Sequence, residues 1–416
     1  MKAVTNNRKQ DQALLSSLDE ETLNAGCAEA ARNRRRLRRR EFLQWACLAC
    51  GATAMGQDAA SRGGAGVDLS GLKFKPEEPF TPVEARFWEP MGDRKVRCKL
   101  CPHECQVADQ ERGTCGVREN TGGKYYTLVH SRVCAAHVDP IEKKPLFHYL
   151  PGTTAFSIAT PGCNMECQYC QNWQISQFRP EQIACHHLPP ADAVSVARRE
   201  SAPSIAFTYS EPVVYYEYMY DVAAAARKAG LGSVMISNGF IQAEPLRKLI
   251  PVLSAIKVDF KGFSEGFYHR ICRGKLKPVL DALSIMRSSG IWLELVMLVV
   301  PTLNDALAEN REMFAWIRRN LGDQVPLHLT RFHPTYKLTN LPATPVATLE
   351  KLHAEARQAG LKYVYVGNVY GHATENTLCP SCGKVVIGRV GFQVVRNDVR
   401  KGRCAHCQAP IAGVFK

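Results

Sequence analysis

The chain has 416 residues, of which 45% are hydrophobic, and its 24 prolines are spread along the sequence. This composition is typical of a soluble globular protein with room for one large domain and appendages, and the lack of any long apolar run argues against a membrane-embedded protein. Seven arginines between Arg32 and Arg40 carry half of the net charge of +14. Such a run is usually a solvated tail or a targeting signal and only sometimes a nucleic-acid-binding patch.

Residues 1–71 are expected to be disordered or to form a leader. They combine a polar start, the arginine run, an Ala/Cys/Gly-rich stretch and a Gly-rich end. The run Arg38-Arg39-Arg40-Glu41-Phe42-Leu43 is similar to a twin-arginine export signal, although 37 residues precede it. The sequence therefore leaves two locations open, the cytoplasm and export by the twin-arginine route.

Most of the 17 cysteines fall into three compact groups with the spacing of metal ligands. The first group lies in residues 72–150, which we expect to form a Cys-rich metal-binding subdomain. We call it the N-terminal quartet, and its members are Cys98, Cys101, Cys105 and Cys115. Its spacing is less regular than that of a zinc ribbon, so zinc and a second iron–sulfur cluster both stay open.

Six cysteines lie outside the three groups. Those in the folded part are expected to be buried thiols, which is the usual state of an unpaired cysteine. The six are Cys27, Cys47, Cys50, Cys134, Cys185 and Cys272.

Residues 151–375 alternate short β-branched runs with helical patterns, which predicts a parallel sheet covered by helices. Helical patterns such as 213–229 and 276–289 end just before a glycine. Because no Gly-x-Gly-x-x-Gly motif opens a helix, a partial (βα)6 barrel of the TIM type is favoured over a doubly wound sheet. The predicted strands are 155–160, 204–209, 233–237, 255–260, 292–300, 327–332 and 363–366.

The second cysteine group, Cys163, Cys167 and Cys170, directly follows the first strand of this predicted barrel. Loops at the carboxyl ends of barrel strands build the active sites of such folds. Three thiolates so close together can hold a [4Fe-4S] cluster and leave one iron without a protein ligand. The alternatives are an incomplete zinc knuckle or thiols that only pack, but zinc prefers two pairs of ligands, and a second pair is missing nearby.

The spacing Cys163-x3-Cys167-x2-Cys170, with Tyr169 before the last cysteine, resembles the radical S-adenosylmethionine enzymes. Within them the chain is similar to the pyruvate formate-lyase activating enzymes, and more closely to the radical enzyme of the AmmeMemoRadiSam system. The closer resemblance covers residues 95–385. It is carried by the N-terminal quartet and by the segments 116–120, 139–144, 170–172, 367–369 and 379–382.

The resemblance implies a [4Fe-4S] cluster on the three cysteines, with S-adenosylmethionine on the open iron. Reductive cleavage would give a 5′-deoxyadenosyl radical that abstracts hydrogen from an unidentified substrate. Residues at the ends of successive strands would bind the cofactor, and a histidine would lie beside it. By their match to the family, the binding residues would be Tyr169, Glu211, Asn238, Asp259 and Lys261, and the catalytic residue His333. Where the family has Gly-Gly-Glu, this chain has Tyr209-Ser210-Glu211.

The third group of cysteines lies in residues 376–416, which are expected to form a zinc-ribbon-like module. Two Cys-x2-Cys pairs, Cys379/Cys382 and Cys404/Cys407, are separated by 21 residues, a spacing typical of structural zinc. An auxiliary iron–sulfur cluster is the rival interpretation. We call these four cysteines the C-terminal quartet.

The family resemblance also implies partners. A low-potential donor such as flavodoxin or ferredoxin would supply electrons. The enzyme would either activate a glycyl radical enzyme or modify a protein or small molecule together with Memo-like and AMMECR-type proteins. The alternative function is a zinc-ribbon protein that binds nucleic acid and has an inactive barrel. The two hypotheses differ in their metals, because only the enzyme requires an iron–sulfur cluster.

Overall fold

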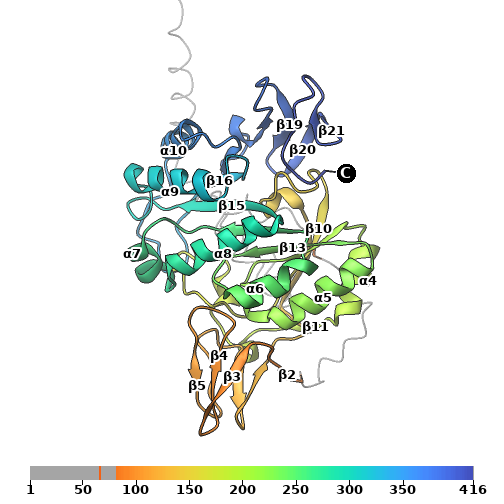
Figure 1. Ribbon diagram of the computed structural model, residues 1–416, viewed down its shortest axis with the longest axis vertical. Coiled ribbons are helices and arrows are strands. Elements are labelled where there is room, and N and C mark those ends of the chain that lie inside the picture. The colour runs from red at the N-terminus through yellow and green to blue at the C-terminus, as the bar shows by residue number, and fades with distance from the viewer. Residues whose placement is uncertain (1–64, 67–80, 416) are drawn as a thin grey trace, which may run out of the picture. The chain divides into compact units, whose positions relative to one another are not determined.

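The computed structural model describes residues 65–66 and 81–415, all within one compact unit of the chain (Figure 1). Apart from Ala65 and Gly66, the predicted leader lies outside the described residues. The same is true of the arginine run and of Cys27, Cys47 and Cys50. None of the described helices has the length and apolar character needed to cross a membrane.

A nine-stranded, mainly parallel sheet forms the centre of the described structure, with the strand order β1-β9-β10-β12-β13-β14-β15-β16-β17. Strands β10 and β12 to β17 run parallel, and β9 joins β10 antiparallel. The strands are β1 (Ala65–Gly66), β9 (Ala135–Pro140), β10 (Thr154–Ala159), β12 (Ser204–Phe207), β13 (Gly232–Ser237), β14 (Ala255–Asp259), β15 (Trp292–Val299), β16 (Leu327–Arg331) and β17 (Val364–Gly367).

Helices connect the parallel strands, and Figure 1 shows α5, α6 and α8 side by side along the sheet. Strand β12 is buried at every position, as expected for a strand covered on both faces. Helix α8 ends where Gly290 takes a left-handed φ of 77°, which glycine adopts without strain. The helices are α3 (Trp173–Ser176), α4 (Pro190–Arg199), α5 (Tyr216–Lys228), α6 (Ala243–Leu249), α7 (Glu265–Phe267), α8 (Leu276–Ser289), α9 (Leu307–Asn320) and α10 (Val346–Gln358).

The predicted α/β architecture with a mainly parallel sheet is confirmed. All seven predicted strands are present, and their ends differ from the prediction by at most two residues. The antiparallel edge strands β9 and β1 were not predicted. The sequence places β9 inside the Cys-rich segment, where no helix–strand alternation marks it.

The Cys-rich segment before β9 folds into small antiparallel sheets. Its buried residues, among them Val96, Leu100 and Val117, belong to the same hydrophobic cluster as the parallel sheet. The segment therefore shares its core with the sheet. Its strands are β2 (Val83–Glu84), β3 (Trp88–Gly92), β4 (Lys95–Cys98), β5 (Gln106–Val107), β6 (Arg118–Thr121), β7 (Lys124–Thr127) and β8 (Arg132–Val133), and β11 (His186–His187) pairs with β8.

The C-terminal module has a small hydrophobic cluster of its own, built around Val386, Ile387 and Ile411. Arg389 joins the module to the connection between β9 and β10, because its buried guanidinium donates to the Phe147 carbonyl oxygen at 2.7 Å and lies 4.1 Å from the centre of that ring. The strands of the module are β18 (Thr377–Leu378), β19 (Val385–Val390), β20 (Gln393–Asn397), β21 (Val399–Arg400) and β22 (Arg403–Cys404).

Candidate active site

The loop that carries Cys163, Cys167 and Cys170 leaves the carboxyl end of β10 and is fixed to the helical turn Tyr268–Cys272, which follows β14. The backbone N–H groups of Glu166 and Gln168 donate to the carbonyl oxygens of residues 272 and 271, at 2.9 and 3.0 Å. Gly162, at the start of the loop, has a φ of 104°, and a Cβ there would lie 2.6 Å from Val117 Cγ1. Only glycine fits this position, so Gly162 sets the direction in which the cysteine loop departs.

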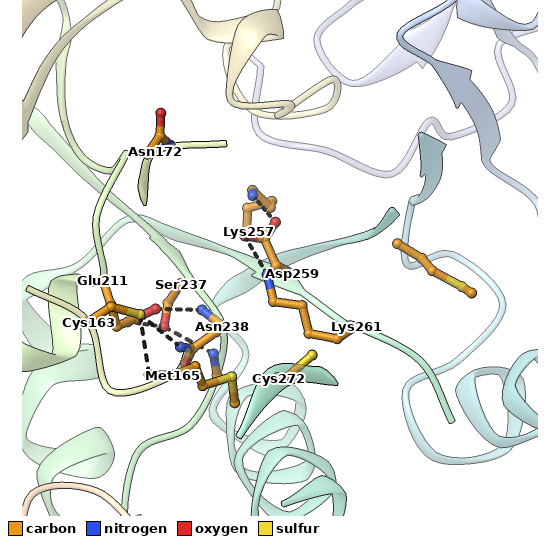
Figure 2. Close-up of polar contacts among 12 residues, drawn as sticks. Cys163, Met165, Asn172, Glu211, Ser237, Asn238, Lys257, Asp259, Lys261 and Cys272 are labelled. Carbon is orange, nitrogen blue, oxygen red and sulfur yellow. Dashed lines mark hydrogen bonds and ion pairs between the residues drawn. The ribbon is translucent and has the colours of Figure 1, made fainter. Parts of the chain in front are cut away.

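The Cys163 sulfur lies among nitrogen donors (Figure 2). Its Sγ accepts from the Met165 N–H at 3.3 Å and lies 4.0 Å from the Asn238 side-chain nitrogen. Burial raises the pKa of the Cys163 thiol above its ordinary value, and the Glu211 carboxylate raises it further. A buried thiol of this kind ionises when a cation compensates its charge, which is the behaviour of a metal ligand.

Glu211 links the loop after β12 to the end of β13. Its buried carboxylate accepts from the Ser237 hydroxyl at 2.6 Å, from the Asn238 N–H at 2.8 Å and from the Val213 N–H at 3.1 Å. Burial raises the pKa of Glu211 to about 7, against the opposing effect of these three donors. Both carboxylate oxygens are thus engaged inside the protein, and only their remaining lone pairs are free to receive a ligand.

Tyr209 has a left-handed φ of 66° at the position where the resemblance expects glycine. This conformation costs a non-glycine residue energy, and the tyrosine gains compensating contacts. Its hydroxyl donates to buried Asp139, and its ring lies 4.8 Å below the Lys144 ammonium. The backbone of this loop therefore keeps a glycine-like conformation although the glycine is gone.

Asn238, at the end of β13, orients the cysteine loop. Its side-chain nitrogen donates to the Asn164 amide oxygen at 2.8 Å, and its own amide oxygen accepts from the Phe240 N–H at 2.9 Å. Asn164 directly follows Cys163 and donates to the Phe240 carbonyl oxygen at 2.8 Å. Two strand ends are thereby joined beside the first cysteine.

Asp259 and Lys261 lie at the end of β14, where Figure 2 shows them together with Lys257. The Asp259 carboxylate pairs with the Lys257 ammonium and lies 3.4 Å from that of Lys261. Burial alone would raise the pKa of Asp259, but the two lysines lower it to about 2. The group therefore keeps one negative and two positive charges, and its net charge of +1 suits a carboxylate ligand.

Tyr169 and His333, both predicted site residues, lie in different surroundings. The Tyr169 ring is buried, and its hydroxyl lies 3.4 Å from the Cys272 sulfur. His333 is exposed on the loop after β16, and burial of part of its ring lowers its pKa below the ordinary value. The structure thus brings Cys163, Glu211 and Asn238 into contact but leaves His333 at the surface.

Known proteins are similar to this chain over the residues that form the candidate site. The radical SAM superfamily profile matches residues 157–314. An uncharacterized protein of Methanocaldococcus jannaschii is 46% identical over 330 residues, which cover 79% of this chain and 98% of that protein. The chain belongs to the radical SAM superfamily. It is also homologous to pyruvate formate-lyase 1-activating enzyme of Escherichia coli K12, with 19% identity over 49% of this chain and 89% of that enzyme.

Solved radical SAM structures are also similar. The crystal structure of a radical SAM methyltransferase from Sphaerobacter thermophilus shares 14% identity with this chain. The match covers 74% of this chain and 81% of that one, with a TM-score of 0.45.

As a radical SAM protein, the chain is an enzyme, and its family implies a [4Fe-4S] cluster and S-adenosylmethionine. The residues present fit the cluster. Cys163, Cys167 and Cys170 supply three thiols on one loop, and N–H groups point at the first sulfur, as is usual around cluster ligands. The alternative of a nucleic-acid-binding protein with an inactive barrel is not favoured, because the match to the superfamily includes this loop.

Two residues that lie beside these candidate residues were not predicted as site residues. Lys257 is buried on β14 and pairs with Asp259; an ionisable residue in the apolar run Ala255-Ile-Lys-Val-Asp259 was the available signal. Cys272 is a buried thiol, as expected, and its side chain also lies within hydrogen-bonding reach of Cys167. Nothing in the sequence around Cys272 indicates this contact, because it depends on how two loops meet.

The C-terminal quartet gathers as a metal site would. The sulfur atoms of Cys379 and Cys407 lie 3.6 Å apart, those of Cys382 and Cys404 lie 3.8 Å apart, and all four fall within 4.8 Å of one another. A tetrahedral zinc ion with Zn–S bonds of about 2.3 Å would place its sulfur ligands roughly 3.8 Å apart. The four cysteines fit a zinc-ribbon-like module.

Proposed function

We propose that this enzyme holds a [4Fe-4S] cluster on Cys163, Cys167 and Cys170 and binds S-adenosylmethionine beside it. The observation that carries the proposal is the contact of the cysteine loop with the ends of β12 and β13. The Glu211 N–H donates to the Gly162 carbonyl oxygen at 3.3 Å, and the Asn238 side chain donates to the Asn164 amide oxygen at 2.8 Å. When bound, the cluster and S-adenosylmethionine supply a 5′-deoxyadenosyl radical that abstracts hydrogen from the substrate.

The protein's own residues would orient the cofactor. Lys261 presents an ammonium whose pKa burial alone would lower, but Asp259 and Cys167 raise it above its ordinary value. It therefore stays charged and suits the methionine carboxylate. Asn238 and Glu211 would face the ribose and the methionine ammonium, and Tyr169 would support the loop. His333 would act near the cofactor only after the β16 loop carries it inward.

A cleft beside the first cysteine is the proposed entry for the substrate. It has a volume of about 730 Å³, and its lining is predominantly polar and includes Cys163, Arg179 and Lys337. We further propose that the parallel strands curve into a partial (βα)6 barrel, which would direct these loops toward one mouth. The polar lining favours a polar or charged substrate over a lipid.

The finer assignments follow from family resemblance. One reaction is activation of a partner enzyme by formation of a glycyl radical. The other is modification of a protein or small molecule together with Memo-like and AMMECR-type partners, as in the AmmeMemoRadiSam system. Radical SAM enzymes take electrons from reductants such as flavodoxin, and a flavodoxin or ferredoxin is the proposed donor. Zinc on the C-terminal quartet would stabilise that module.

Location is a separate proposal with two forms, cytoplasmic retention and export by the twin-arginine route. The arginine run that bears on it lies outside the described residues. Fractionation of cells that express the full chain, compared with a double variant Arg38→Lys/Arg39→Lys, distinguishes the two. Export predicts that the variant accumulates in the cytoplasm, whereas retention predicts no difference.

The central proposal is tested with the full chain, reconstituted with iron and sulfide without oxygen, reduced and mixed with S-adenosylmethionine. We expect 5′-deoxyadenosine as a product. A triple variant with alanine at Cys163, Cys167 and Cys170 should lose a cluster and the product together. Cys185→Ala, a thiol outside the three groups, is the matched control. An intact cluster on Cys163, Cys167 and Cys170 that yields no 5′-deoxyadenosine would contradict the proposal.

A further inference from the structure

The N-terminal quartet lines a narrow, partly open cavity of about 10 Å³ beside the cysteine loop of the active site. All four cysteines face this cavity, although they come from separate points between β4 and β6. Apolar side chains, among them Leu100, Val213 and Val214, form much of the remaining wall. Four soft thiol ligands line this one space, and no carboxylate is among its lining residues, which indicates a metal centre.

The spacing of the sulfur atoms separates this site from a zinc site. Within the described residues, the C-terminal quartet is the only group of three or more Cys, His, Asp or Glu ligand atoms that lie within 4.8 Å of one another. The N-terminal quartet is therefore more widely spaced than one zinc ion allows, since tetrahedral zinc places its sulfur ligands roughly 3.8 Å apart. The three cysteines of the active-site loop are spread in the same way.

A [4Fe-4S] cluster explains this wider spacing, because each of its four thiolate ligands binds a different iron atom. The sulfur atoms of the N-terminal quartet thus have the wide spacing of a cluster site, and those of the C-terminal quartet have the close spacing of a zinc site. The active-site cysteines provide an internal reference, because the family implies a cluster there and their sulfur atoms also fail to gather around a single point.

We propose that Cys98, Cys101, Cys105 and Cys115 bind a second [4Fe-4S] cluster in which every iron has a cysteine ligand. Such a cluster has no open iron, so it transfers electrons and does not bind S-adenosylmethionine.

The residues around the cavity suit a cluster of this kind. The Thr114 hydroxyl lies 3.3 Å from the Cys105 sulfur, and the Thr114 N–H donates to the same sulfur at 3.5 Å. The buried Arg118 guanidinium also lines the cavity, and Glu217 partly balances its charge. Hydrogen bonds to the sulfur ligands and a nearby cation stabilise the negative charge that a cluster gains on reduction.

The site directly contacts the active-site loop. The His103 ring nitrogen lies 2.7 Å from the carbonyl oxygen of Asn164, the residue after Cys163. A Cβ at Gly162, the residue before Cys163, would lie 3.2 Å from the Cys115 carbonyl oxygen. Cys115 and Cys163 also line the same cleft. The loops that carry the two sets of cysteines are therefore in direct contact.

Because the two loops are in contact, we assign the second cluster a role in electron delivery. This role rests on the proposed function. A low-potential protein or chemical reductant loses one electron to the second cluster. That electron passes to the active-site cluster and is consumed when the carbon–sulfur bond of S-adenosylmethionine is cleaved. No proton or other co-reactant is needed for the transfer.

The test begins with metal analysis of the wild-type full chain after anaerobic reconstitution. We expect about eight iron atoms per chain and about one zinc. Electron paramagnetic resonance of the reduced protein should show two cluster signals, and S-adenosylmethionine should alter only one of them. About four iron atoms with two zinc ions would overturn the second cluster. This measurement requires no variant, so misfolding cannot obscure it.

A double variant, Cys98→Ala/Cys101→Ala, assigns the signals. It should lose about half of the iron and the signal that S-adenosylmethionine does not alter. The double control Cys134→Ala/Cys185→Ala should keep both the iron and this signal. Loss of zinc with unchanged iron would refute the inference. Failure of the proposed function would look different, because then S-adenosylmethionine would alter neither of the two signals.

Discussion

At the scale of single residues, Cys272 tests whether the active-site cluster keeps an open iron. Its buried thiol lies 3.4 Å from the Tyr169 hydroxyl and within hydrogen-bonding reach of Cys167. A fourth thiol so close to the three proposed ligands could complete the set and exclude S-adenosylmethionine. Its present contacts to Tyr169 and Cys167 instead give it a packing role that supports the loop.

We therefore expect Cys272→Ala to leave the iron content unchanged and to preserve cleavage of S-adenosylmethionine. The loss of a buried thiol should lower the free energy of unfolding by about 1 kcal/mol. Iron analysis and the yield of 5′-deoxyadenosine measure the first two quantities. A variant that loses iron would show that Cys272 is itself a ligand.

The lysines on the two sides of Asp259 are expected to have different roles. Lys257 is buried and pairs with Asp259, whereas Lys261 lies farther from that carboxylate, at 3.4 Å. Lys261→Met should weaken binding of S-adenosylmethionine about tenfold, because a charge-assisted hydrogen bond is lost. It should change stability little, since Asp259 keeps its other partner. Anaerobic equilibrium binding measures the affinity.

Asp259→Asn is the matched comparison for stability. It leaves the buried Lys257 ammonium without its carboxylate, which should cost about 3 kcal/mol in the free energy of unfolding. The exposed lysine on α8, changed in Lys277→Met, is the control for both measurements. Unchanged affinity in Lys261→Met would remove Lys261 from the binding site.

At the scale of elements, His148 connects the sheet to the C-terminal segment. Its ring is fully buried, with one nitrogen 2.6 Å from the Ala412 carbonyl oxygen and the other 2.5 Å from the Tyr365 hydroxyl. Burial lowers the pKa of His148 to about 4, below the ordinary value of 6.5. Its unfolded form therefore binds a proton at a higher pH than its folded form.

This difference predicts a loss of stability in acid. The contribution of His148 is complete above about pH 6.5 and falls as the pH drops toward 4. Between about pH 7.5 and pH 5, the wild-type free energy of unfolding should fall by about 2 kcal/mol more than that of His148→Gln. Urea unfolding measures both, with the exposed histidine in His269→Gln as control. Parallel pH profiles of wild type and His148→Gln would contradict the assignment.

The elements of the sheet could be predicted from sequence because their signals are local. Strands such as Ala255–Asp259 are short buried runs, and helix Leu276–Ser289 ends at a glycine. The partners of β9 could not be predicted in this way. Its residue Asp139 bonds to Tyr209, 70 residues away, and no local pattern encodes such a contact.

The same distinction applies to the site. The cysteine triplet and Asp259–Lys261 could be proposed from the sequence because each lies within a few residues at a strand end. The contact of Asn238 with the loop of Cys163 spans more than 70 residues. The spacing of the cysteines along the sequence could not decide between zinc and an iron–sulfur cluster for the N-terminal quartet. The separation of its sulfur atoms depends on how the hairpins fold.

At the scale of the whole molecule, the two quartets belong to parts that differ in their cores. The segment of the N-terminal quartet shares one hydrophobic cluster with the parallel sheet, through residues such as Val96 and Val117. The C-terminal module has a separate cluster of few residues. A core that small needs additional stabilisation, which we assign to a metal on Cys379, Cys382, Cys404 and Cys407.

Removal of zinc should therefore unfold the C-terminal module before the rest of the described structure. With a zinc chelator, amide hydrogen exchange should accelerate in 377–411, while 95–127 should keep the protection of the sheet because its buried side chains form the same cluster. Cys404→Ala/Cys407→Ala should reproduce this pattern without chelator and retain its iron. Exchange measured by mass spectrometry on the zinc-loaded wild type is the control. Early exchange in 95–127, independent of the strands β10 to β17, would show that the N-terminal segment is stabilised separately.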